Sequence, residues 1–230
     1  IFSLAKVGAG AISKRLRARS FKLTILSHWV SYKILKKFEL PYANLISASG
    51  GNFVILLPNL PNIDEKLEKI QAELDTILIK DYSGEIAFHL AWESFSGKQF
   101  EKSEFPRVLK NVHTKLAIKK KKPFSKYLVK DGAWQPENFK LERPIESEEK
   151  VCVICKKHPG EPDPKENNEI VCKSCKNDRE LGEKLVNANG VAFYDKDPGQ
   201  GFPILIEKET KKDASEKKEM EMTGFVVPLK

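Results

Sequence analysis

Residues 45–57 have the sequence LISASGGNFVILL, in which two short runs of strand-forming residues flank Gly50-Gly51. A glycine pair supplies the positive φ angles that a two-residue hairpin turn requires. Pro58 ends the second run, because proline lacks the N–H that a strand would donate. The pattern predicts a β-hairpin with strands at 45–49 and 52–57 and its turn at Gly50-Gly51.

The flanking sequence predicts two helices and a further strand. Residues 14–38, with Ser13 as N-cap, are basic in the first half and apolar nearly all round in the second, and Pro41 limits the helix. Apolar residues at helical spacing predict a second helix over 63–80. Residues 86–95 alternate between two faces, which indicates a half-buried strand.

All four cysteines form two CxxC pairs separated by sixteen residues, Cys152/Cys155 and Cys172/Cys175. Two such pairs can complete the tetrahedral thiolate shell of one structural zinc ion, and the polar loop between them needs a cross-link to fold. Four thiolates leave no open coordination position, which argues against a hydrolytic zinc. Two disulfides, or a redox-active or catalytic site, are the alternatives. Nothing in the sequence indicates the secretion that would favour disulfides.

The fold class expected is therefore α+β. The order helix, strand, strand, helix, strand becomes βαββαβ, a ferredoxin-like palm, if one strand precedes residue 1, so the first strand is expected to be missing. We expect three regions: a palm with a basic helical extension over 1–130, a linker over 131–150, and a zinc-binding domain over 151–230. The last contains a helix at 178–185, short strands at 191–194, 202–206 and 225–227, and a charged mobile loop at 207–222.

Charge is distributed unevenly over the 230 residues, whose net charge is +8. Residues 1–40 carry nine Lys/Arg and one acid (+8), residues 41–97 three and eight (−5), residues 98–130 eleven and two (+9), and residues 131–230 seventeen and twenty-one (−4). Two basic blocks suggest a polyanionic partner such as nucleic acid, although basic helices are also often simply solvated.

The sequence contains no apolar run long enough for a membrane span, and the apolar residues 1–12 lack the preceding cationic region of a signal peptide. We therefore expect a cytoplasmic protein with no membrane partner. The chain opens on Ile1-Phe2 without an initiator methionine, so we expect it to be part of a longer protein.

Several motifs together resemble the large palm-containing subunit of type III CRISPR effector complexes, the type III-A kind in particular. They are RARSF at 17–21, SASGGNF at 47–53, LLPN at 56–59, the four-cysteine ribbon, and GFP at 201–203. The resemblance covers nearly the whole chain and identifies it with the first palm plus the zinc region.

The resemblance implies a parent subunit with an HD nuclease domain, two palms, a zinc-binding insertion and a helical C-terminal domain. Such subunits respond to target RNA by cutting single-stranded DNA and by making cyclic oligoadenylates from ATP with Mg²⁺ or Mn²⁺. The implied partners are the rest of the subunit, the other effector subunits, and guide and target RNA through the complex. The present sequence lacks the His-Asp pair of the nuclease and the Gly-Gly-Asp-Asp turn of the second palm.

No catalytic residue is assigned. Palm enzymes hold two Mg²⁺ ions on carboxylates beside the strand turn, whereas Asn52 and Phe53 follow the turn here. The nucleotide-binding candidates are Ser47, Ser49, Gly50 and Gly51, because hydroxyls and turn N–H groups can contact phosphate or ribose. By resemblance the two palms face each other across ATP. An ordinary hairpin turn remains the alternative.

The other candidate residues have ordinary structural explanations. His28 is expected to lie in a buried helix, and His89 to be a packed or surface residue and not a ligand. His158 is unnecessary beside four cysteines, and His113 is a candidate phosphate contact. Trp134 is a candidate for docking on a neighbour. Two further functions stay open, a stand-alone zinc-ribbon nucleic-acid-binding protein that uses its basic helices, and a nucleotidyl cyclase-like enzyme, against which Asn52 argues.

Overall fold

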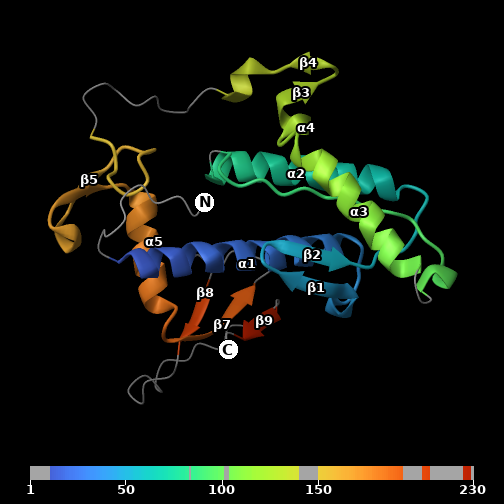
Figure 1. The fold of residues 1–230 in the computed structure, drawn as a ribbon, viewed down its shortest axis with the longest axis horizontal. Coiled ribbons are helices and arrows are strands. Elements are labelled where there is room, and N and C mark those ends of the chain that lie inside the picture. Colours follow the sequence, from blue (N-terminus) through green and yellow to red (C-terminus); the bar gives the residue numbers. More distant parts are fainter. Residues whose placement is uncertain are drawn as a thin grey trace. The chain divides into compact units, whose positions relative to one another are not determined.

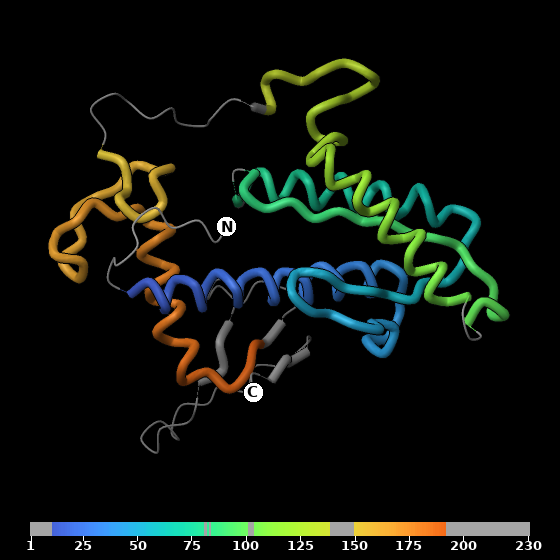
Figure 2. Tube along the Cα trace, in the orientation of Figure 1, coloured from blue at the N-terminus to red at the C-terminus, as the bar shows by residue number. Residues whose placement is uncertain are grey.

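The computed structural model describes residues 11–82, 84–100, 104–139 and 150–193, together with the backbone of strands at 204–207 and 225–228. The chain divides into two compact units (Figures 1 and 2). One contains residues 2–56 and 145–230, and the other contains residues 57–144. These units do not follow the boundaries expected at residues 130 and 150, because the first helix and the hairpin group with the cysteine region.

Helix α1 (Ile12–Lys37) is the central helix of the first unit, in which it contacts β1, β2 and α5. Its core-facing apolar residues are Ala18, Ile25, Leu26, Val30, Ile34 and Leu35. The sequence predicts Ser13 as the N-cap of this helix, and that prediction is wrong. The cap is Ala11, which adopts a left-handed conformation without a side-chain hydrogen bond, and Ser13 lies inside the first turn.

The predicted hairpin is confirmed. Strands β1 (Leu45–Ser49) and β2 (Asn52–Ile55) pair antiparallel, with Ser49 opposite Asn52, after a short 3-10 turn η1 (Tyr42–Asn44). Gly50 and Gly51 have φ values of 58° and 84°. Positive φ at both turn positions is the two-residue geometry that matches the twist of the paired strands, which is why the glycine pair predicted it.

The cysteine region of the same unit begins with a small antiparallel pair, β5 (Glu161–Asp163) and β6 (Glu169–Val171), joined through η4 (Pro164–Glu166). Helix α5 (Lys173–Lys184) follows and crosses α1 near its first turns (Figure 1). A three-stranded sheet of order β8-β7-β9 completes the unit, from β7 (Ala188–Phe193), β8 (Ile204–Glu207) and β9 (Phe225–Pro228). The short C-terminal strands were thus correctly predicted, whereas residues 208–222 of the expected mobile loop lie outside the described residues.

The second unit is mainly helical. It contains α2 (Ile63–Tyr82), η2 (Gly97–Phe100), α3 (Glu104–Lys120), α4 (Ser125–Leu128), the two-residue strands β3 (Val129–Lys130) and β4 (Ala133–Trp134), and η3 (Pro136–Phe139). Helix α2 buries Leu67, Ile70, Leu74 and Leu78, the stripe that its sequence periodicity predicts. None of the helices in the described part of the chain is both long and apolar enough to cross a membrane.

The strand expected over 86–95 is wrong as a sheet element. The alternation holds over residues 86–90, where Ile86, Phe88 and Leu90 are buried, but the segment joins no β-ladder with the strands described. The side chain of Gln71 on α2 replaces the missing strand. Its Nε2 donates to Phe88 O at 2.8 Å and its Oε1 accepts from Leu90 N at 2.7 Å, so the core-facing backbone is satisfied without a neighbouring strand.

The fold is therefore a mixed arrangement of helices and small sheets with a cluster of four cysteines. The hairpin and both long helices were predicted correctly. The βαββαβ palm arrangement of residues 13–96 is not confirmed, because the described sheet of that region has two strands.

Candidate metal centre

The four cysteines converge on one point. Their sulfur atoms all lie within 4.8 Å of one another, and no other group of histidine, cysteine or carboxylate residues converges in this way among the described residues. Cys152 and Cys155 lie in a tight turn closed by Lys156 N–H donating to Cys152 O at 2.9 Å. Cys172 is the N-cap of α5 and Cys175 lies in its first turn. Each CxxC pair is thus positioned by a local turn.

The arrangement fits a tetrahedral zinc ion. Zinc–thiolate bonds of about 2.3 Å place neighbouring sulfurs of a tetrahedral site about 3.8 Å apart. The Sγ atoms of Cys155 and Cys172 are separated by 3.8 Å, and all four cysteines are free thiols. A disulfide would need sulfurs about 2 Å apart. A bound zinc would supply the cross-link that this small polar loop region lacks.

The thiols influence one another strongly. Hydrogen bonds from Cys172 and Cys175 lower the pKa of Cys155, so it ionises before those two thiols. The same contact with Cys155 raises the pKa of Cys172 to about 12 and also raises that of Cys175, because a second thiolate would face the first in a buried site. A divalent ion removes this repulsion, and its binding must release the remaining thiol protons.

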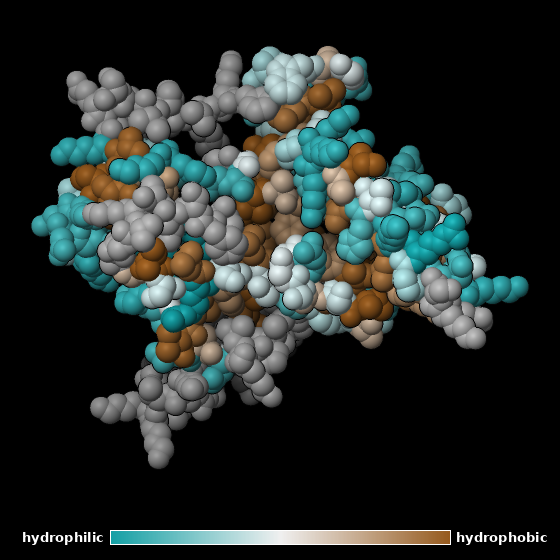
Figure 3. All heavy atoms as spheres, in the orientation of Figure 1, coloured by the Kyte–Doolittle hydropathy of each residue, from teal (hydrophilic) through white to brown (hydrophobic). Residues whose placement is uncertain are grey.

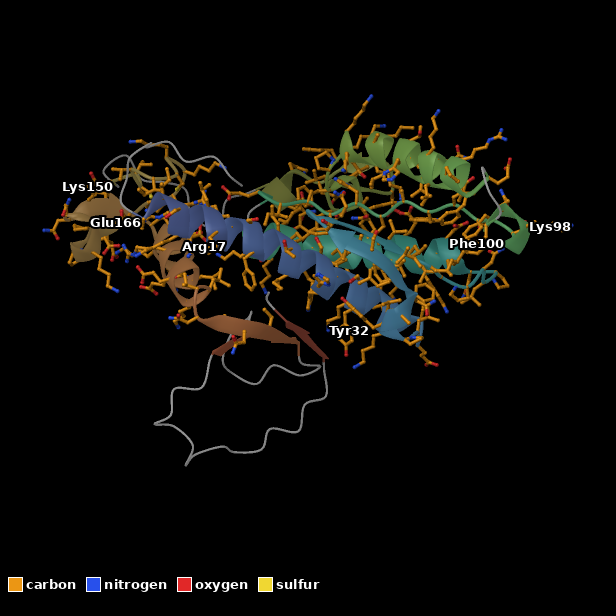
Figure 4. The ribbon with its side chains drawn as sticks, turned by 60° about the horizontal axis from the view of Figure 1, so that its bottom comes forward. Arg17, Tyr32, Lys98, Phe100, Lys150 and Glu166 are labelled. Carbon is orange, nitrogen blue, oxygen red and sulfur yellow. The ribbon has the colours of Figure 1, made fainter. Side chains whose placement is uncertain are left out.

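A buried group of arginines and acids surrounds the cysteines. Arg15 pairs with Glu166 and donates from Nε to Cys175 O at 3.1 Å. Arg179 bridges Asp163 at 2.8 Å and Glu166 at 3.0 Å. These contacts tie the start of α1 to the loop between the two CxxC pairs. Figure 4 labels Arg17 on α1 and Glu166 in that loop.

A second contact set joins α1 to α5. Arg19 Nε lies 2.7 Å from Asp178 Oδ2, and its terminal nitrogen donates to Cys175 Sγ at 3.5 Å. Lys22 Nζ reaches the other oxygen of Asp178 at 2.6 Å. Burial opposes the charge of Arg19, but the hydrogen bond and charge of Asp178, together with the negative charge of a Cys155 thiolate, raise its pKa, so it stays protonated.

The basic first half of α1 is therefore not the free nucleic-acid face that the sequence suggested. Arg15 and Arg19 are buried and their charges are used inside the protein. A signal for this was present, since positions 15, 18, 19, 22 and 25 continue the stripe that is apolar later in the helix. The acidic partners, more than 140 residues away in the chain, gave no such signal.

The proposed nucleotide-binding residues lie together at the hairpin. Ser47 and Ser49 are two positions apart on β1, so they share one face, and both are exposed, as is Gly50. A Cβ added at Gly50 or Gly51 would meet no atom within 4 Å. The turn is thus open to an approaching molecule, and the adjacent residues Asn52 and Phe53 offer no carboxylate.

The histidines and Trp134 are placed individually. Burial lowers the pKa of His28, whose Nδ1 lies 2.7 Å from Tyr42 Oη, and burial with Lys120 and Lys119 lowers the pKa of His89. His158 is not part of the cysteine cluster, although its carbonyl accepts from Cys152 N–H. His113 is exposed on α3. Trp134 is 56% exposed on β4, as a docking residue would be.

Comparison with known proteins identifies the family. The family model described as Csm1 subunit domain B matches residues 1–134. A CRISPR system single-strand-specific deoxyribonuclease Cas10/Csm1 of subtype III-A from Thermococcus onnurineus is 32% identical over 121 residues, which are 51% of this chain and 15% of that protein. The Streptococcus thermophilus protein of the same description is 24% identical over 206 residues, 89% of this chain and 25% of that protein.

Solved structures show the same fold. A Csm1-Csm4 cassette in complex with cA3 aligns with a TM-score of 0.57 at 22% identity, covering 90% of this chain and 23% of that one. A Csm1-Csm4 subcomplex of the type III-A CRISPR-Csm interference complex gives a TM-score of 0.57 at 22% identity, covering 86% and 23%. The chain spans about a quarter or less of the length of these relatives. With the domain B match extending over more than half of its residues, the chain belongs to the Csm1 family.

Proposed function

We propose that this chain is the domain B and zinc-binding part of the large subunit of a type III-A CRISPR RNA-guided antiviral effector complex. In this proposal it scaffolds the subunit and contributes one wall of the ATP site for cyclic oligoadenylate synthesis, while other domains of the subunit cut single-stranded DNA. The observation that carries the proposal is the match to Csm1 domain B, joined to a four-cysteine cluster.

The metal in this proposal is a structural zinc bound by Cys152, Cys155, Cys172 and Cys175. Support comes from the sulfur separations, from the burial of Cys152, Cys172 and Cys175, and from the convergence of four thiols, the number that completes a tetrahedral shell. Metal analysis of the purified chain should give about one zinc per molecule, and Cys172→Ser should lose it. A protein that contains no zinc and two disulfides would contradict the assignment.

The nucleotide site in this proposal is the hairpin turn, with Ser47 and Ser49 offering hydroxyls and Gly50 and Gly51 letting ATP approach the backbone. Support comes from the open space around both glycines and from relatives solved with one ATP and with cA3. Mg²⁺ or Mn²⁺ would be held by the second palm, because this hairpin provides no carboxylates.

The hairpin assignment is tested by Gly51→Val in the full subunit. Position 51 has positive φ, so the variant strains the turn by about 1–2 kcal/mol and also crowds the ligand. We expect lower ATP affinity and oligoadenylate synthesis with unchanged RNA-triggered DNA cleavage, and thermal stability serves as the control. If Gly51→Val folds stably and makes oligoadenylates at the normal rate, the turn has only a structural role and the nucleotide-site assignment is contradicted. Oligoadenylate formation by the isolated 230-residue chain would also contradict the proposal, since it assigns no catalytic residue here.

The proposed partners are the remaining domains of the subunit, a Csm4-like neighbour, and guide and target RNA within the complex. Solved relatives contain Csm1 with Csm4. Helix α3 is the best candidate for an RNA contact, because residues 105–130 contain no acid and hydrophilic side chains gather over α3 in Figure 3. The exposed cations of residues 105–130 include Arg107, Lys110, Lys120, Lys121 and Lys122.

The RNA contact is tested by changing Lys120, Lys121 and Lys122 together to Gln in the assembled complex. Phosphate contacts make binding salt-dependent, so the triple variant should bind RNA more weakly and with a shallower salt dependence. Changing the exposed Lys36 and Lys37 of α1 and Lys184 of α5 to Gln removes the same number of positive charges and serves as the control for net charge. Equal effects of both sets would remove α3 from the proposal.

A further inference from the structure

Arg19 occupies a special position among the cations of α1, because it contacts both a buried acid and a cysteine sulfur. Its side chain is 8% exposed, with Nε 2.7 Å from Asp178 Oδ2. Its terminal nitrogen donates to Cys175 Sγ at 3.5 Å. Asp178 and Cys175 are three residues apart on α5, so they lie on the same face of that helix. The ion pair with Asp178 fixes the plane of the Arg19 guanidinium, and this orientation directs its terminal N–H at the sulfur of Cys175.

We propose that Arg19 is a positioning residue of the metal centre, through which helix α1 holds the Cys175 thiolate in place for the ion. The proposal rests on the zinc site described above and extends it to a residue more than 150 positions away in the sequence. It makes the metal site a property of two segments, the CxxC pairs and the start of α1.

Electrostatics favours this role. Zn²⁺ with four thiolates carries a net charge of −2, and such a charge in a buried site requires nearby compensation. Arg19 supplies a positive charge at the sulfur, and Arg15 supplies another at the carbonyl oxygen of the same cysteine. Cys175 is therefore fixed at its side chain and at its backbone by two residues of α1.

The contact has a spectroscopic consequence. An N–H donated to a thiolate withdraws electron density from the sulfur, which raises the energy of sulfur-to-metal charge transfer. In the Co²⁺-substituted chain, loss of this hydrogen bond should shift the charge-transfer band to lower energy. A residue that merely packed beside the site would leave the band in place.

The variants are Arg19→Ala, which removes cation and donor, and Arg19→Lys, which keeps the cation but loses the planar fork. Arg17→Ala is the matched control, because Arg17 donates to Gly182 O at 2.9 Å in the same α1–α5 interface without touching a sulfur. Lys22→Ala is the electrostatic control, because Lys22 binds the same carboxylate as Arg19.

In competition with a chromogenic chelator, Arg19→Ala in the full chain should bind zinc about 10–100-fold more weakly than wild type, as is typical when a partner of a metal ligand is lost. The zinc affinity of Arg19→Lys should lie between those of wild type and Arg19→Ala. Both Arg19 variants should show the shift of the cobalt charge-transfer band. Arg17→Ala and Lys22→Ala should keep the wild-type band. Equal band positions in the Arg19 variants and in Arg17→Ala would overturn the proposal, as would an equal affinity loss in Lys22→Ala.

If Arg19→Ala does not fold, the wild-type chain gives a second measurement. Removing zinc should increase amide exchange in residues 15–22 of α1 as well as around the cysteines, because metal and helix stabilise each other. Unchanged exchange in α1 would overturn the proposal. A wild-type chain that binds no metal at all would instead refute the zinc assignment, so the two failures are distinguishable.

Discussion

The backbone of Gly182 on α5 lies directly against the backbone of Lys14 on α1. A Cβ built at Gly182 would come within 2.0 Å of the carbonyl oxygen of Lys14 and 2.5 Å of its carbonyl carbon. Real Cβ atoms do not approach a backbone so closely, and a backbone cannot rotate away as a side chain can. The close crossing of the two helices therefore requires glycine at this position.

Gly182→Ala should force α1 and α5 apart. Overpacking typically costs about 1–3 kcal/mol of unfolding free energy, and a backbone clash should lie at or above the upper end. Gly97→Ala is the matched control, since a Cβ there meets nothing within 4 Å. Thermal denaturation should show a large loss for Gly182→Ala and little change for Gly97→Ala. Equal melting temperatures would mean that the helices do not cross in this way.

Arg179→Met should be strongly destabilising, because it leaves the buried carboxylates Asp163 and Glu166 with less compensation. Breaking a buried ion pair by removing one partner typically costs about 3–5 kcal/mol. Lys14→Ala is the comparison, because its pair with Glu183 is exposed and such pairs contribute little. Denaturant unfolding of both variants measures the contrast. A small effect of Arg179→Met would show that Arg15 alone neutralises the acids.

The parts of this fold that were predictable from sequence are those set by local pattern. The hairpin follows from Gly50-Gly51 between strand-forming runs, and the buried stripe of α2 follows from its periodicity. The four metal ligands follow from CxxC spacing, which requires no knowledge of the rest of the chain. In each case the interacting residues are near one another in sequence or are chemically unmistakable.

The failures involve partners that are distant in sequence. Arg15 and Arg19 belong to a basic segment of the kind that often binds nucleic acid. They are buried because Glu166 and Asp178 of the cysteine region pair with them. The alternation of residues 86–95 correctly gave one buried face, but it could not reveal that the side chain of Gln71 would replace a neighbouring strand. The Ser13 failure is instead local, because Ser13 has the residue type of an N-cap, yet the helix begins at Ile12.

Gln71→Leu should therefore lower the free energy of unfolding, because no neighbouring strand can take over the hydrogen bonds that Gln71 makes. The variant removes the partners of Phe88 O and Leu90 N, and each unsatisfied buried group costs about 1–3 kcal/mol. Gln99→Ala is the control, because its bond to Ser96 N–H is exposed. We expect faster amide exchange at Leu90 and lower stability in Gln71→Leu alone. An unchanged exchange rate at Leu90 would mean that another group binds this segment.

His89 should make the second unit sensitive to mild acid. Burial, followed by the positive charges of Lys120 and Lys119, lowers its pKa below the ordinary value of about 6.5. The unfolded chain then binds a proton more readily than the folded one, so stability is complete above about pH 6.5 and declines as the pH falls through that value toward the folded pKa. In His89→Gln the free energy of unfolding should fall less than in wild type as the pH is lowered from about 7.5 to below 6.5. In an NMR titration of the imidazole, Lys120→Gln should raise the pKa of His89 toward its ordinary value, whereas the exposed Lys130→Gln should leave it in place. A His89 that titrates at its ordinary pKa in the wild-type chain would show that neither burial nor the α3 lysines act on it.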